Sequence, residues 1–174
     1  MAIRPIITAP DPRLTETAAP VERVDDEVRL LMEDMLDSMH AARGIGLAAP
    51  QIGVAKRVIV IDIDREGVQS GPLFLANPEI VAVSDEDYVY EEGCLSVPEH
   101  YAEVVRPGGV TLRYLDRENE IREMQADGIL AVCLQHEIDH LDGILFIDHL
   151  SSLKRNIILR KLTKAKKAAA EATV

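Results

Sequence analysis

The segment from His136 to His140, with the sequence HEIDH, holds the residues best suited to chemistry in this chain. Positions four apart lie on one face of a helix, so both imidazoles could reach the same metal ion. Glu137 would then lie beside any water that the ion holds. This H-E-x-x-H pattern is typical of metal-dependent hydrolysis, because it places two ligands and a general base in one helical turn. The simpler alternative is a core helix with two hydrogen-bonded histidines and a surface glutamate.

A buried helix is the expected setting for this motif. Residues 128–135, which precede it, are largely apolar and contain no helix breaker after Gly128. Gly143 follows the motif and would end the helix. The sequence therefore predicts a helix that carries both histidines into the interior of the protein.

Two histidines make an incomplete catalytic site, because such a metal ion normally has three protein ligands and one open position. Downstream of the motif the candidates for a third ligand are Asp142, Asp148 and His149. Upstream lies Cys94, held between a glycine that allows close backbone approach and a nearby proline that fixes the exit of the loop. Cys94 is suited to supply a thiolate, although a lone cysteine is more often a small packed residue.

Composition limits the class of protein. The length of 174 residues favours one domain over 1–174, and the hydrophobic content of 47% argues against a disordered chain. No apolar run reaches bilayer length, and the first ten residues lack the charged head and long apolar segment of a signal peptide. We therefore expect a cytoplasmic protein that does not bind a membrane. A disulfide between the two cysteines is not expected there.

The net charge of −11 conceals an asymmetry along the chain. Residues 154–174 carry seven basic residues and one acidic residue, while the preceding 153 residues carry a balance of −17. A basic helical tail on an acidic body suggests docking to an anionic partner. The alternative is a solvated helix end whose lysines and arginines complement the helix dipole.

The remaining elements are those that must position the motif. Residues 4–20 are Pro-rich and irregular, and an amphipathic helix is expected from Asp25 or Asp26 to about Arg43. Strands are expected at 56–63, at 73–83 with a break at Asn77-Pro78, at 87–91, at 104–105, and as a hairpin over 110–125. A final helix should start near Ser151 or Ser152. This order predicts an α+β fold, with antiparallel or mixed sheets packed around the central metal-binding helix and with N-terminal and C-terminal helices.

Three segments together resemble the signature motifs of peptide deformylase, in the order and spacing of that family. They are residues 44–53 (GIGLAAPQIG), 92–96 (EGCLS) and 135–143 (QHEIDHLDG). Residues 11–14 (DPRL) also resemble the N-terminal segment of the family, and the resemblance covers about residues 3–160. It is closest to the shorter bacterial type with a C-terminal helix.

The resemblance implies that Cys94, His136 and His140 hold one divalent metal ion. The family usually holds iron(II) in the cell, and the ligand types also suit zinc, nickel or cobalt in a purified sample. By resemblance, Glu137 is the general base for hydrolysis of the N-formyl group on the initiator methionine, with release of formate. The side chain of Gln51 and the backbone N–H of Leu95 correspond to the donors that stabilise the oxyanion.

The resemblance also implies how the substrate binds. Ile45, Gly46 and Gly93 would pair with the peptide as an added strand. Apolar residues of the metal helix, Ile129, Val132 and Cys133, would line the pocket for the methionine side chain. Tyr101 is a departure, because many members of the family carry an arginine there that contacts the downstream part of the peptide.

The expected partners are nascent peptides that begin with N-formylmethionine, and the ribosome through the basic tail, rather than DNA or a membrane. Two other functions are alternatives to deformylation. The first is an H-E-x-x-H endopeptidase, which would require a downstream third ligand. The second is a metal-stabilised, non-catalytic protein that binds the ribosome, which would lack a competent base or oxyanion donor.

Overall fold

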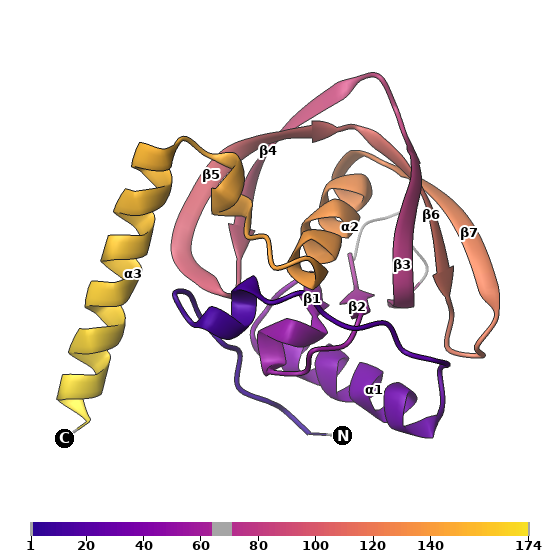
Figure 1. Cartoon of the computed structure of the whole chain (residues 1–174), viewed down its shortest axis with the longest axis horizontal. Coiled ribbons are helices and arrows are strands. Elements are labelled where there is room, and N and C mark those ends of the chain that lie inside the picture. The colour runs from indigo at the N-terminus through magenta and orange to yellow at the C-terminus, as the bar shows by residue number, and fades with distance from the viewer. Residues whose placement is uncertain (1, 64–70, 174) are drawn as a thin grey trace.

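The computed structural model describes residues 2–63 and 71–173 of the chain. In Figure 1 the strands arch over a central helix, α2, while α1 lies below them and α3 lies at the outer edge. The three helices are α1 (Asp26–Ala41), α2 (Gly128–Leu141) and α3 (Ser152–Ala172). None of the described helices is long and apolar enough to cross a membrane. The predicted α+β class, with helices at the start, centre and end, is confirmed.

Two antiparallel sheets surround α2. The larger one has the order β1-β2-β3-β6-β7, and the smaller one pairs β4 with β5. Their bounds are β1 (Gly46–Ala48), β2 (Val58–Ile61), β3 (Leu73–Val83), β4 (Asp87–Cys94), β5 (Val97–Pro107), β6 (Gly109–Leu115) and β7 (Ile121–Asp127). Three short 3₁₀ turns, η1 (Pro12–Thr15), η2 (Ala49–Ile52) and η3 (Phe146–His149), connect these elements.

The metal helix α2 is almost entirely buried, as its apolar sequence predicts. Leu130, Ala131 and Leu134 pack with Ile59 and Leu75 of the large sheet in one core cluster. A second cluster packs α1 against β1 and β2, and a third joins the N-terminal segment, β5, η3 and α3. Since side chains surround α2 on all sides, the histidines that it carries are enclosed by protein rather than by water.

The helix ends follow the signals in the sequence. The carboxylate of Asp25 accepts a hydrogen bond from the backbone of Val28, so α1 begins at the predicted residue. It ends at Ala41, just before Arg43, because Arg43 leaves the helical conformation with a φ of 59°. Gly143 ends α2 with a φ of 73°, where a side chain would collide with the carbonyl oxygen of Thr15.

Several strands differ from prediction. Residues 73–83 form one strand, so the predicted break at Asn77-Pro78 is wrong. A register shift between Ala76 and Glu79 admits the proline as a bulge, and the side chain of Asn77 exchanges two hydrogen bonds with the backbone of Val21. Strands β4 and β5 are longer than predicted. The sequence does not predict β1, because its three residues begin with a glycine and carry no clear alternation.

Candidate metal centre

One cysteine and two histidines converge where β4 ends beside α2. Cys94 is the last residue of β4, and His136 and His140 lie one turn apart on α2. The Sγ atom of Cys94 lies 3.3 Å from Nε2 of His140, and the three ligand atoms all lie within 4.8 Å of one another. A tetrahedral ion with bonds of about 2.0–2.3 Å requires ligand atoms about 3.3–3.6 Å apart. The three side chains therefore fit a single transition-metal ion with only small shifts.

The two imidazoles are prepared for this role in different ways. Nδ1 of His136 donates to the carboxylate of Glu92 over 2.9 Å, which leaves Nε2 for a metal ion. Burial favours the neutral form of His136, but its hydrogen bonds to Cys94 and Glu92 hold its pKa well above the usual value. Binding of an ion therefore displaces a proton. Burial and the charge of His136 lower the pKa of His140, so its ring is neutral and ready to ligate.

Glu92 connects this centre to a buried cation. The guanidinium of Arg106 donates to both oxygens of Glu92, over 2.7 and 3.0 Å. Burial by itself would raise the pKa of Glu92, but the hydrogen bonds from His136 and Arg106 outweigh it and lower the pKa. Glu92 is therefore an anion that fixes the tautomer of His136.

Glu137 lies in the same enclosure but makes different contacts. Its Oε2 atom is buried and has no hydrogen-bond partner among the described residues, and burial raises the pKa of the carboxyl to about 7. Gly46 of β1 faces this carboxylate, and a Cβ atom there would lie 2.7 Å from Oε1. The glycine thus leaves room for a carboxylate whose pKa suits proton transfer near neutrality.

The side chain of Gln51 is oriented by its surroundings. Its Oε1 accepts from the backbone of Ala48 over 2.9 Å. Its Nε2 donates to Oγ of Ser96 over 3.0 Å and makes a longer contact, 3.6 Å, with Sγ of Cys94. Leu95 lies between Cys94 and Ser96 in the tight turn that joins β4 to β5. The two predicted oxyanion donors therefore flank the cysteine.

A cavity of about 450 Å³ opens onto this centre. Of the predicted substrate-binding residues, five line it, namely Ile45, Gly46, Gly93, Val132 and Cys133. Ile129 packs in the core cluster between α2 and the large sheet and is not among the residues that line this cavity. Tyr101, with 68% of its surface exposed, pairs with Gly93 across the small sheet and covers it with its ring.

The downstream candidates for the third ligand lie elsewhere. Asp142 pairs with Arg57, Asp148 pairs with Arg155, and His149 bonds to Asp139. Among the described residues, the one group with ligand geometry is the set that contains Cys94. Sequence reasoning missed Arg106 and Asp139 as neighbours of the site and Ser96 as a partner of Gln51. Ser96 lies inside the 92–96 motif and Asp139 inside the 135–143 motif, and this placement is the signal that could have indicated them.

Comparison with known proteins agrees with this geometry. The family model described as polypeptide deformylase matches residues 3–156. The chain belongs to the polypeptide deformylase family. Deformylases are hydrolases that depend on a metal ion and remove the formyl group from the N-terminal methionine of new polypeptides, and this chain has that activity.

Relatives of this deformylase cover nearly its whole length. The peptide deformylase of Phenylobacterium zucineum is 59% identical over 97% of this chain and 100% of its own. The crystal structure of the enzyme from Ehrlichia chaffeensis is 40% identical, with a TM-score of 0.93 over 97% of this chain and 99% of its own. A structure of the Acinetobacter baumannii enzyme with bound Met-Ala-Ser is 34% identical, with a TM-score of 0.81 over 86% of this chain and 99% of its own.

Proposed function

We propose that this deformylase works through one divalent ion held by Cys94, His136 and His140, with Glu137 as its general base. The convergence of these ligands from β4 and α2, with a buried carboxylate beside them, is the observation that carries the proposal. A non-catalytic metal site would have no need for an unpaired buried carboxylate. An endopeptidase of the H-E-x-x-H type would take its third ligand downstream, where the candidates are already paired with other residues.

The ion, when bound, lowers the pKa of a water molecule and polarises the formyl carbonyl. Glu137 accepts a proton from the attacking water and passes it to the amine as the C–N bond breaks. Proton transfer of this kind contributes about 10²–10⁴ in rate. The confined position of the carboxylate, next to Gly46, keeps it aligned for both transfers.

Gln51 and Leu95 stabilise the oxyanion that develops on the formyl oxygen. The Nε2 group of Gln51 keeps its bond to Ser96 and exchanges its longer contact with Cys94 for the substrate oxygen. The backbone N–H of Leu95 supplies the second donor. Removal of one donor of this kind costs about 10²–10³ in turnover.

The peptide extends along the mouth of the cavity as an added strand. Ile45, Gly46 and Gly93 line this cavity and offer backbone groups to the substrate. The methionine side chain enters the part of the cavity lined by Val132 and Cys133. Tyr101 presents its exposed ring to the residues after the methionine. The Met-Ala-Ser bound to the Acinetobacter relative supports a peptide that begins with methionine as the ligand of this cavity.

Iron(II) is the ion that we propose for the enzyme in the cell. One thiolate and two imidazoles also suit zinc, nickel and cobalt, whose general affinity for such sites exceeds that of iron. A purified sample can therefore carry any of these metals. The assay must be made on anaerobically prepared protein whose metal content is measured.

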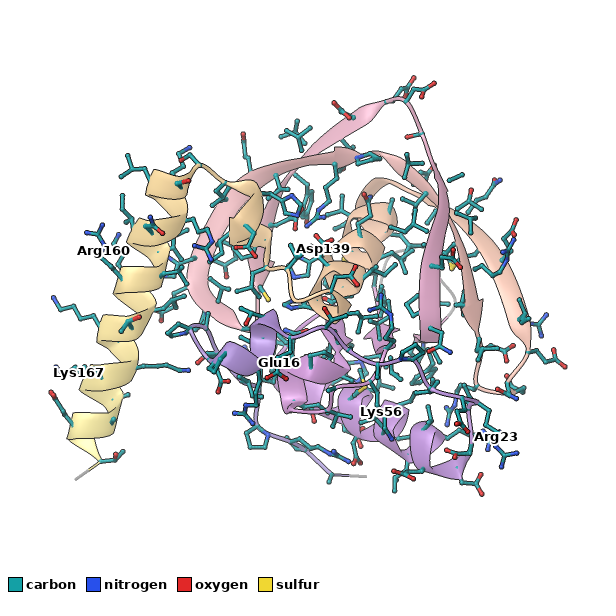
Figure 2. The ribbon with its side chains drawn as sticks, in the orientation of Figure 1. Glu16, Arg23, Lys56, Asp139, Arg160 and Lys167 are labelled. Atoms are coloured by element: carbon teal, nitrogen blue, oxygen red, sulfur yellow. The ribbon has the colours of Figure 1, made fainter. Side chains whose placement is uncertain are left out.

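We propose that the whole chain, 1–174, is one catalytic domain of the cytoplasm, and that its C-terminal helix binds the ribosome. Arg160, Lys164 and Lys167 line one groove on α3, and Figure 2 shows Arg160 and Lys167 projecting from the outer helix. Ribosomal RNA is a dense anionic surface that such a face can bind. Deletion of the helix would also remove the buried Leu162, so substitution of the charges is the cleaner test.

The ribosome test uses glutamine in place of Arg160, Lys164 and Lys167. Loss of three phosphate contacts should reduce the slope of log affinity against log salt by about 2–3. The matched control is Lys56→Gln, which removes a charge beside α1 on the other side of the molecule (Figure 2). Unchanged ribosome affinity and salt dependence in the triple variant would refute the docking role.

The catalytic proposal is tested by formate release from formyl-Met-Ala-Ser. The native enzyme should release formate, while Glu137→Ala should retain its metal and lose about 10²–10⁴ of the rate. Acetyl-Met-Ala-Ser serves as the matched substrate without a formyl group. Native turnover by Glu137→Ala would remove this residue from the mechanism.

A further inference from the structure

A chain of hydrogen bonds runs from His136 to the surface. Glu92 accepts from Nδ1 of His136 over 2.9 Å, and Nε and Nη2 of Arg106 donate to its two oxygens. The remaining arm of the guanidinium, Nη1, donates to Oδ2 of Asp139 over 2.8 Å. The same Oδ2 atom contacts Nε2 of His149 over 2.9 Å. Asp139, labelled in Figure 2, thus extends from α2 to η3, where the chain of bonds ends.

The network joins the two elements that carry the metal ligands. Glu92 lies on β4, two residues before Cys94, and Asp139 lies on α2, directly before His140. Arg106 lies on β5 and bonds to both, so one guanidinium connects the cysteine strand to the histidine helix. Its side chain is only 5% exposed, and Glu92 is 3% exposed, so water does not compete for these bonds.

Only the planar fork of an arginine can make this connection. Nε and Nη2 match the two oxygens of Glu92 in parallel, and Nη1 points away from them toward Asp139. A lysine would keep the charge but could not hold both carboxylates in these positions. The geometry is therefore more specific than neutralisation of a buried charge requires.

We propose that Arg106 is a positioning residue that fixes Cys94 relative to His136 and His140, and that Asp139 and His149 brace it from outside. The inference rests on the proposed metal site. Through Glu92, Arg106 sets the direction of the His136 ring, and through Asp139 it sets the distance between β4 and α2. The three ligands are therefore already assembled before the ion binds, and this raises the affinity of the site for the ion.

The test measures cobalt(II) binding to the full chain by chelator competition and by absorption spectroscopy. Removal of the outer partners of a metal ligand typically costs 10–100-fold in affinity. Arg106→Lys should therefore raise the dissociation constant about 10–100-fold and alter the cobalt ligand-field bands. Circular dichroism of the metal-free proteins reports whether the variant is folded. Arg113→Lys is the matched control, because Arg113 makes an exposed pair with Glu123 on the other sheet.

Wild-type affinity and an unchanged cobalt spectrum in folded Arg106→Lys would overturn the inference. If Arg106→Lys fails to fold, cobalt binding is measured on Asp139→Asn instead. This variant removes the carboxylate that pairs with Arg106 from outside, at a partly exposed position. Weakened cobalt binding by this variant supports the inference, and native binding overturns it. Failure of the native chain to bind one cobalt ion would instead contradict the proposed metal site.

Discussion

Substitution of Gly46 would displace the carboxylate of Glu137, the proposed base, without a mutation of Glu137 itself. An added Cβ atom would lie 2.7 Å from Oε1 of Glu137, where ordinary contacts begin at 3.4 Å. In Gly46→Ala the carboxylate must therefore retreat by about 0.7 Å, and a misplacement of about 1 Å can cost about 10² in rate. We expect kcat to fall about 10–100-fold, below the loss of about 10²–10⁴ expected when the base is removed altogether.

Stability and metal content should change little in this variant. The nearest atom is the end of a side chain, which moves more easily than backbone, and alanine lowers the entropy of the unfolded chain. The assay is formate release at saturating formyl-Met-Ala-Ser, with bound metal and thermal unfolding measured on the same preparation.

The control is Gly109→Ala, where the added atom would meet nothing closer than 3.4 Å. Native kcat in a fully metallated Gly46→Ala enzyme would refute the argument that the position of the carboxylate limits turnover. Loss of metal would show that the substitution disturbs α2 instead of Glu137 alone.

Three further predictions concern the same site. Gln51→Ala should keep its metal and lose about 10²–10³ of kcat, since an oxyanion donor is lost; an undiminished kcat would exclude that role. Cys94→Ser should weaken zinc binding, measured by chelator competition, and native affinity would indicate a different third ligand. Burial raises the pKa of Glu137 from 4.5 to about 7, so ionisation destabilises the metal-free fold as pH rises through this range. Metal-free Glu137→Gln should therefore unfold at a higher temperature than the native chain at pH 8, with no difference near pH 4.

The helices could be predicted from sequence because local signals determine them. Asp25 caps α1, and the apolar run before His136 forms α2 as expected. The strands were harder, since their extent depends on partners. Pro78 predicted a break in β3, but the pairing with β6 continues on both sides of it, with a bulge in between. Long-range pairing thus outweighed a local signal.

The residues of the site also fall into two groups, those that local spacing predicts and those whose contacts depend on the rest of the fold. Spacing alone identified His136, Glu137 and His140, because a helix brings them together whatever the rest of the fold does. Cys94 became the third ligand only by family resemblance, since its distance from α2 depends on the path of β4. The contacts of Arg106 could not be predicted, because its two carboxylate partners lie on different elements.

The most direct test of the account is an anaerobic titration of the metal-free protein with iron(II). Formate release from formyl-Met-Ala-Ser and bound iron are measured at each step. Activity should rise in proportion to bound iron and saturate at one ion per chain, and Cys94→Ala should show no such saturation. Full occupancy without formate release, or full activity in the absence of any bound metal, would contradict it.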